Sequence, residues 1–133
     1  MTNIDWKSLN ILVVDDDMAQ RRLQVFVLNQ LGVTKVRMAE NGLLALVELS
    51  SEPTPFDLVI SDLDMPTMTG FEFVKRLRTN ADVINPDVPV LIITSNKARE
   101  TVQKSIDLGV QGFITKPINE AKLRLAITRA LSQ

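Results

Sequence analysis

The stretch "ILVVDDDM", residues 11–18, carries a run of four apolar residues directly into three consecutive aspartates. Runs of Val, Ile and Leu of this length are typical of a strand that is buried on both faces of a parallel sheet. Adjacent carboxylates repel one another, so the arrangement costs stability unless a cation compensates for it. The stretch therefore predicts a buried strand that ends in an acidic site, and either other parts of the chain or a binding partner must supply the compensating charge.

The composition limits the chemistry that such a site can perform. The chain has 133 residues, of which 45% are hydrophobic and 23% charged, and it contains no cysteine and no histidine. This excludes disulfides, thiolate metal sites, histidine general bases and histidine metal ligands. No apolar run approaches the roughly 20 residues that span a bilayer, and the first ten residues lack a signal-peptide core. We therefore expect one cytoplasmic domain over residues 1–133, with its core at about 10–131.

The net charge is only −1, but the charges are unevenly distributed along the chain. Residues 1–96 contain 8 Lys and Arg against 13 Asp and Glu, whereas residues 97–133 contain 7 against 3. Two regions of opposite sign indicate a separate role for each region rather than a general nucleic-acid footprint. We expect no direct binding to nucleic acid and none to a membrane.

Apolar runs alternate with segments of helical spacing along the whole chain. The runs predict strands at residues 10–14, 35–38, 57–61, 88–93 and 111–115. A helix is expected to begin at Asn41-Gly42 and to end near residue 49, and the other helices are predicted from apolar positions at helical spacing: Leu23, Val27 and Leu31; Phe71, Val74 and Leu77; Val102 and Ile106; Leu123, Ile127 and Leu131. The alternation predicts an α/β fold, an open doubly wound sheet of five parallel strands flanked by five helices.

Two helix starts carry the pattern of a capping box, in which a polar side chain precedes Gln or Glu by three positions. These pairs are Asp17 with Gln20 and Thr69 with Glu72. Asp17 is thereby assigned to the cap of the first helix. The two aspartates before it remain for chemistry.

Polar side chains stand at the carboxyl ends of four of the five predicted strands, where ligands bind in open α/β sheets. Asp15 and Asp16 follow the first strand, Asp62 the third, Thr94 the fourth and Lys116 the fifth. If the second strand lies at the edge, these side chains converge on one crevice. Three clustered carboxylates require a hard divalent cation such as Mg²⁺ or Mn²⁺, and a hydroxyl and an ammonium would bind phosphoryl oxygens. The pattern predicts phosphoryl chemistry with a carboxylate nucleophile.

Taken together, these residues resemble the receiver domain of two-component response regulators from residue 11 to about 131. The matching motifs are "DDD" at 15–17, "DLDMPTMTG" at 62–70, Thr94-Ser95 and "TKP" at 115–117. The resemblance implies a flavodoxin-like sheet in the order 2-1-3-4-5, known for the chemotaxis member of the family, and a cis bond between Lys116 and Pro117. Met65 and Met68 are expected to pack the second motif, because a thioether is a poor ligand of Mg²⁺.

The resemblance also implies the roles of the acidic residues. Asp62 would be the phosphoacceptor, and Asp16 and Asp62 would bind Mg²⁺ directly together with the backbone carbonyl of Asp64. Asp15 would bind the ion through water or orient it. A separate histidine kinase or histidine phosphotransfer protein would supply the phosphoryl group. The domain would assist its own phosphorylation and dephosphorylation without being an enzyme, and Asp64 and Asn96 would flank the path of the attacking water.

The remaining implied roles concern how phosphorylation would be transmitted to a partner protein. Thr94 and Lys116 would contact the phosphoryl oxygens, and movement of Thr94 would let Phe113 turn inward. The reshaped face would comprise the helix around 102–106, the strand at 111–115 and the last helix. Because this face carries most of the basic excess, we expect a downstream partner with an acidic patch. The basic residues are Lys97, Arg99, Lys104, Lys122, Arg124 and Arg129.

Several alternatives remain. Asp62 would serve as a loop cap, Lys116 as a solvated surface residue, and Thr94 and Phe113 as strand packing in a domain without this chemistry. The basic residues would then be solvated helix faces. The chain is also compatible with the receiver part of a longer regulator that has an output domain. An FMN-binding flavodoxin is disfavoured, because three aspartates would repel its phosphate.

A haloacid-dehalogenase-like phosphatase is the enzymatic alternative, with Asp15 as the nucleophile and Asp17 as the acid. That family requires a further acidic pair after a late strand, where this chain offers Asn119 and Glu120. It would also leave the acidic loop at Asp62 without a role. The order of motifs therefore favours the receiver domain.

Overall fold

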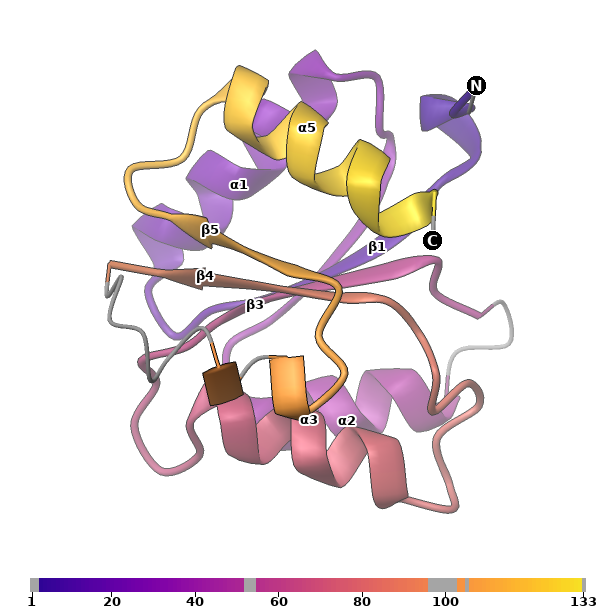
Figure 1. The fold of residues 1–133 in the computed structure, drawn as a ribbon, viewed down its shortest axis with the longest axis vertical. Helices are drawn as coiled ribbons and strands as arrows, with labels where there is room; N and C mark the ends of the chain where they lie inside the picture. Colours follow the sequence, from indigo (N-terminus) through magenta and orange to yellow (C-terminus); the bar gives the residue numbers. More distant parts are fainter. Residues whose placement is uncertain (1–2, 52–54, 96–102, 105, 133) are drawn as a thin grey trace.

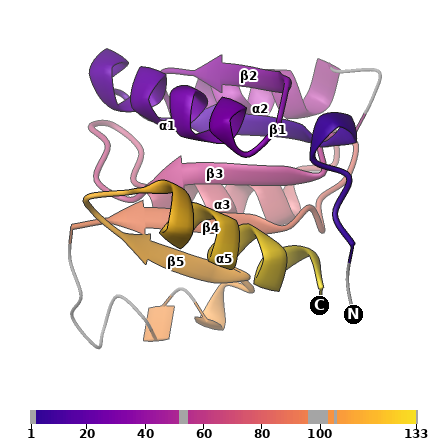
Figure 2. The same cartoon turned by 90° about the horizontal axis from the view of Figure 1, so that it is seen from above.

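A five-stranded parallel sheet lies between two layers of helices in the computed structural model, which describes residues 3–51, 55–95, 103–104 and 106–132 (Figure 1). The strands follow the order β2-β1-β3-β4-β5, seen along the sheet in Figure 2. This confirms the predicted fold class and strand order. The strands are β1 (Asn10–Val14), β2 (Lys35–Ala39), β3 (Leu58–Asp62), β4 (Val90–Thr94) and β5 (Gly112–Thr115).

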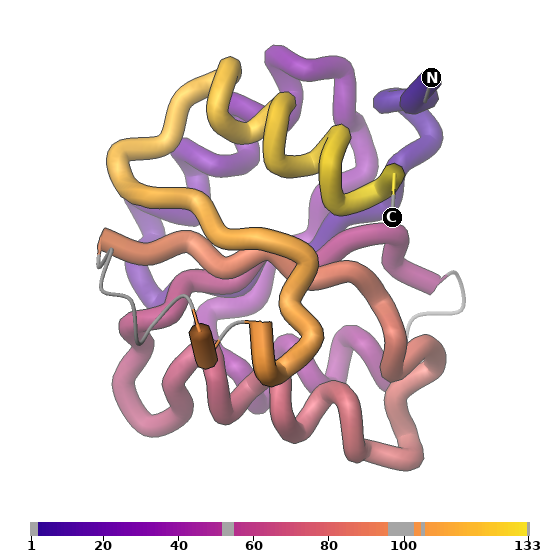
Figure 3. The backbone as a smooth tube through the Cα atoms, in the orientation of Figure 1, coloured from indigo at the N-terminus to yellow at the C-terminus, as the bar shows by residue number. Residues whose placement is uncertain are grey.

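Helices cover both faces of the sheet. Helices α1 (Met18–Gln30) and α5 (Glu120–Leu131) pack on one face, and α2 (Gly42–Ser51) and α3 (Gly70–Thr79) on the other (Figure 1). A short 3-10 helix, Trp6–Ser8, precedes β1 and lies near the end of α5 (Figure 3). The helix predicted around 102–106 falls partly outside the described residues, although 103–104 and 106–107 are helical. None of the described helices is long and apolar enough to cross a membrane.

The central strands are buried along their whole length, as their apolar runs predict. All five residues of β1, of β3 and of β4 are buried. Successive side chains of a strand point to opposite faces, so β1 contributes to two separate cores. Ile11 and Val13 pack toward α1 and α5, and Leu12 and Val14 toward α2 and α3. Burial on both faces holds the end of β1, and the acidic residues after it, in a fixed position.

The buried side of α1 differs from the predicted one. Val27 and Leu31 are buried, but Leu23 is 40% exposed and Gln24 is only 1% exposed. At 3.6 residues per turn, Gln24, Val27, Leu28 and Leu31 form one stripe, and Leu23 lies about 90° from its centre. The i, i+4, i+8 pattern therefore predicts the burial of Val27 and Leu31 correctly and that of Leu23 wrongly.

Smaller differences concern element ends and the other helices. Asp62 and Thr94 are the last residues of β3 and β4 rather than the residues that follow them. In α3 the fully buried aromatic residue is Phe73, whereas Phe71 is only partly buried. Ile106, expected on a buried helix face, is 62% exposed.

Both predicted helix caps are present. The Oδ1 atom of Asp17 accepts hydrogen bonds from the backbone N–H groups of Ala19 at 2.8 Å and Gln20 at 3.4 Å. The Oγ1 atom of Thr69 accepts one from the backbone N–H of Glu72 at 3.2 Å. Each cap satisfies donors that a helix start otherwise leaves unpaired, and so fixes where the chain turns away from the site.

Candidate functional site

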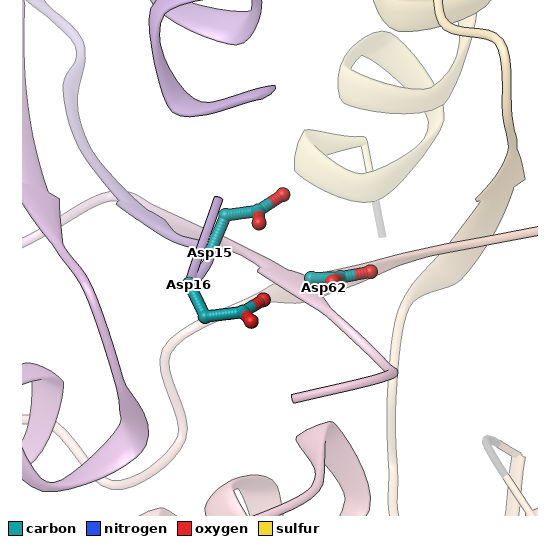
Figure 4. A group of neighbouring side chains, drawn as sticks. All are labelled: Asp15, Asp16 and Asp62. Carbon is teal, nitrogen blue, oxygen red and sulfur yellow. The ribbon is translucent and has the colours of Figure 1, made fainter. Parts of the chain in front are cut away.

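Three carboxylates meet where β1 and β3 end. The two strands are neighbours and pair Val14 with Ser61, so the residues that follow in each strand come together. One carboxylate oxygen from each of Asp15, Asp16 and Asp62 lies within 4.8 Å of the other two (Figure 4). Strand β2 lies at the edge of the sheet, as the predicted convergence requires.

Asp15 is completely buried and is held from several sides. Its Oδ1 atom accepts a hydrogen bond from the backbone N–H of Asp17 at 2.9 Å, and its Oδ2 atom one from Gln24 Nε2 at 3.1 Å. Its backbone carbonyl accepts a hydrogen bond from Arg21 Nη1 at 2.7 Å. Neither Gln24 nor Arg21 was predicted from the sequence to contact Asp15. The signal for Gln24 was a polar residue at the spacing of the apolar stripe of α1.

Asp62 combines burial with a cationic neighbour. It is 3% exposed, and its Oδ1 atom lies 3.2 Å from Nζ of Lys116. The contact is an ion pair without the alignment of a hydrogen bond, and this buried oxygen accepts no hydrogen bond from the described residues. Apart from the contact with Lys116, no group among the described residues occupies the lone pairs of this oxygen.

The environment of the site disfavours negative charge on two of the three acids. Burial is the main cause that raises the pKa of Asp62, the charge of Asp15 raises this pKa further, and Lys116 opposes both. Burial also raises the pKa of Asp15, and the hydrogen bond from the Asp17 backbone opposes the rise. For both acids, loss of hydration raises the pKa more than repulsion between the carboxylates does. A bound cation would relieve both costs.

The cluster has the chemistry and the size of a site for one hard divalent cation. Its donors are all carboxylate oxygens, which suit Mg²⁺ or Mn²⁺. Two ligands on opposite sides of Mg²⁺ stand about 4.2 Å apart, similar to the 4.8 Å limit of this cluster. Asp15 and Asp62 are buried, whereas Asp16 is exposed and leaves a path from solvent. These acids therefore fit the ion that the sequence implied.

The loop between β3 and α3 is packed tightly against Asp62. A Cβ atom at Gly70 would lie 2.5 Å from the backbone oxygen of Asp62, so only glycine fits without displacing the backbone there. Met65 and Met68 are 5% and 4% exposed, which confirms that they pack the loop. The side chain of Asp64 is exposed on the same loop. The close approach at Gly70 was not visible in the sequence.

Thr94 ends β4, Phe113 lies within β5 and Lys116 directly follows β5. Thr94 is fully buried at the end of β4, and its carbonyl accepts a hydrogen bond from the backbone N–H of Lys116 at 2.9 Å. The Lys116–Pro117 bond is cis, as the resemblance implied. Phe113 is partly buried and pairs with Ile92, two residues before Thr94, so Thr94 and Phe113 point to the same face of the sheet.

Several of the basic residues on the predicted signalling face have partners within the domain. Lys104 lies over the ring of Phe71 at 5.1 Å, and Nζ of Lys122 donates to the carbonyl oxygens of Thr115 at 3.1 Å and Pro117 at 3.0 Å. Arg124 donates to Glu120 Oε1 at 2.8 Å. Lys97, Arg99 and Asn96 lie outside the described residues.

An open groove of about 440 Å³ runs along β5 and α5 on this face. Phe113, Leu125, Lys122 and Arg129 are among the residues that line it. Leu125 is 51% exposed. The groove is thus partly apolar, and its two cations lie on α5.

Comparisons with known proteins agree with this geometry. The family model of the response regulator receiver domain matches residues 11–128. Chemotaxis protein CheY-3 of Vibrio cholerae is 36% identical over 118 residues, 89% of this chain and 88% of that protein. Transcriptional regulatory protein ZraR of Klebsiella oxytoca is 34% identical over 126 residues, 95% of this chain and 27% of that protein. The structure of CheY4 of Vibrio cholerae has a TM-score of 0.79 at 33% identity and covers 92% of this chain and 98% of its own. The chain belongs to the response regulator receiver domain family.

Proposed function

We propose that this receiver domain accepts a phosphoryl group on Asp62 from a phosphohistidine of a separate histidine kinase or phosphotransfer protein. The observation that carries the proposal is the buried Asp62 carboxylate, which has Lys116 Nζ at 3.2 Å and two further acids close by. The sequence contains no histidine, so the phosphohistidine would lie outside residues 1–133. In this role the domain is a switch that assists its own phosphorylation and dephosphorylation rather than an enzyme.

The transfer requires little acid–base chemistry from the protein. A carboxylate oxygen of Asp62 attacks phosphorus, an O–P bond forms, and the P–N bond of the donor breaks with its electron pair going to the imidazole nitrogen. No general base is needed, because the ionised carboxylate carries no proton. The ammonium of Lys116 stands beside Asp62, where it offsets negative charge on the phosphoryl oxygens. We assign a second contact with the phosphoryl oxygens, in addition to that of Lys116, to the hydroxyl of Thr94.

The acidic cluster would hold Mg²⁺, with Mn²⁺ as an alternative. Asp16 and Asp62 would bind the ion directly, together with the backbone carbonyl of Asp64. Asp15 would orient the ion or bind it through water, in keeping with its two occupied oxygens. The ion supplies positive charge that offsets the repulsion between the carboxylates and the incoming phosphoryl group.

Phosphorylation would alter partner binding through Thr94, Phe113 and the face that contains β5 and α5. The ion pair of Arg124 with Glu120 reduces the basic character of α5. Lys122 has only uncharged carbonyl oxygens as internal partners, so it keeps its charge and lines the groove together with Arg129. We now place the preference for an acidic partner on the groove between β5 and α5, where apolar contact with Phe113 would accompany it. The downstream partner would therefore be a protein with an acidic and apolar patch.

The test is phosphorylation by a small donor. We expect the chain to gain one phosphoryl group in Mg²⁺ and acetyl phosphate, measured by intact mass, and peptide mapping should place it on Asp62. Asp62→Asn should abolish the gain, and Asp82→Asn, a change of the same kind at an exposed loop position, should not. A phosphoryl group on the peptide that contains Asp15 would contradict the proposal and favour the phosphatase.

A further inference from the structure

Helix α1 carries a polar side chain on its buried side, beside the acidic cluster. Gln24 is 1% exposed on the same stripe as Val27 and Leu28. Its Nε2 donates to Asp15 Oδ2 at 3.1 Å, and its Oε1 is buried without a hydrogen-bond partner among the described residues. A buried carbonyl without a partner destabilises the fold, and an apolar side chain of the same size would avoid that cost. Packing therefore does not explain an amide at this position.

The hydrogen bond to Asp15 gives the amide a role. Both oxygens of Asp15 accept hydrogen bonds, one from the backbone N–H of Asp17 and one from Gln24. Donors on two sides fix the plane of the carboxylate. One turn earlier in α1, Arg21 donates to the backbone carbonyl of the same residue at 2.7 Å. The helix thus holds both the backbone and the carboxylate of Asp15.

We infer that Gln24 is a positioning residue for divalent-cation binding, which it supports by fixing the orientation of Asp15. Groups that hydrogen-bond to the ligands of a metal orient those ligands, and their loss typically weakens metal affinity by 10- to 100-fold. Gln24 carries no charge, so it acts on the geometry of the site and not on its net charge. The inference rests on the proposed role of the acidic cluster as a cation site.

The test compares Gln24→Met with the parent and with Gln30→Met, the same change at an exposed position of the same helix. Methionine keeps the length of the side chain but removes the donor and the unpaired carbonyl. In EDTA, Gln24→Met should unfold at or above the melting temperature of the parent. Its Kd for Mg²⁺, measured by calorimetry, should rise about tenfold. Gln30→Met should match the parent in both measurements.

A kinetic measurement separates this role from a general loss of structure. With acetyl phosphate, the Mg²⁺ concentration that gives half of the maximal phosphorylation rate should rise in Gln24→Met, while the rate at saturating Mg²⁺ stays close to that of the parent. A folded Gln24→Met with the parent's Kd for Mg²⁺ would overturn the inference alone. Absence of Mg²⁺ binding by the parent would overturn the cation site itself, and the inference with it. Should Gln24→Met not fold, Gln24→Leu serves with the same outcomes.

Discussion

The carboxylate of Asp62 is 3% exposed, and burial raises its pKa above the ordinary value. Asp15, also buried, raises this pKa further, and the nearby ammonium of Lys116 offsets only part of the effect. The fold therefore holds the carboxylate of Asp62 in surroundings that disfavour its negative charge. This costs stability, and in the proposed function a bound cation or a bond to phosphorus would relieve the cost.

The raised pKa of Asp62 predicts a pH dependence with a definite sign. An acid whose folded pKa exceeds its unfolded value destabilises the fold fully above the folded pKa, and the cost is relieved as the pH falls through the folded pKa toward about 3.9, the ordinary value for aspartate. In EDTA, the free energy of unfolding of the parent relative to Asp62→Asn should therefore rise as the pH falls below 7. At pH 7, Asp62→Asn should be the more stable protein.

Urea denaturation of both proteins from about pH 7 down to about pH 4 measures this difference. A lower stability of Asp62→Asn than of the parent at pH 7 would show that the ion pair with Lys116 outweighs the cost of burial. If the free energy of unfolding depends on pH in the same way in both proteins, folding does not shift the pKa of Asp62.

At the scale of elements, three adjacent aspartates at the junction of β1 and α1 have three different environments. Asp15 is buried and hydrogen-bonded, Asp16 is exposed beside the other acids, and Asp17 caps α1. The capping pattern made the role of Asp17 predictable from the sequence. The difference between Asp15 and Asp16 depends on Gln24 and Arg21, which reach Asp15 only because α1 turns that side toward the sheet.

Substitutions at this junction should separate stability from metal binding. Asp17→Ala removes the cap and should lower the free energy of unfolding by about 1 kcal/mol. It should keep the rise in melting temperature that Mg²⁺ produces, since binding to the folded state alone raises the melting temperature. Asp16→Ala should lose most of that rise. Melting curves with Mg²⁺ and with EDTA provide the measurement, and an equal loss of the Mg²⁺ effect in both variants would contradict the separate roles.

Near the end of α3, one arginine binds two neighbouring loops, a contact that could not be predicted from the sequence. Arg78 Nη1 donates to the carbonyl oxygens of Pro86 at 2.8 Å and Val88 at 2.7 Å, and its Nη2 donates to that of Gly109 at 3.2 Å. The connection between α3 and β4 is thus held by one side chain, which also holds the turn before β5.

At the scale of the whole molecule, the sheet and its acidic end were predictable because each depends on local sequence. Apolar runs mark buried strands, and the carboxyl ends of parallel strands meet at one edge whatever the details of packing. The contacts of Gln24, Arg21, Gly70 and Arg78 depend on how each helix is rotated against the sheet, or on how closely two backbones approach. A single sequence shows the apolar stripe of a helix but not its exact rotation against the sheet. This is why Leu23, which is exposed, was predicted on the buried side of α1.

The register of the sheet places Thr94 beside β5, the strand that lines the groove. Strand β4 pairs Thr94 with Thr115 and Ile92 with Phe113, so in the proposed switch a movement of Thr94 would act on the face of the sheet that Phe113 shares. Phe113 has no hydroxyl and needs no hydrogen-bond partner when it turns inward. Phosphorylation at Asp62 should therefore change the packing of β5 and α5 through Thr94, at a distance from the acids themselves.

Amide hydrogen exchange tests this coupling without a known partner. In the parent, phosphorylation by acetyl phosphate should change the exchange rates of peptides from residues 111–131, which include β5 and α5. Thr94→Ala should still accept the phosphoryl group on Asp62 but should lose most of this change, because it lacks the hydroxyl that the phosphoryl group attracts. Thr34→Ala, at an exposed position before β2, should behave as the parent does. If phosphorylated Thr94→Ala shows the parent's full change in exchange, the signal reaches β5 and α5 by a route that does not involve Thr94.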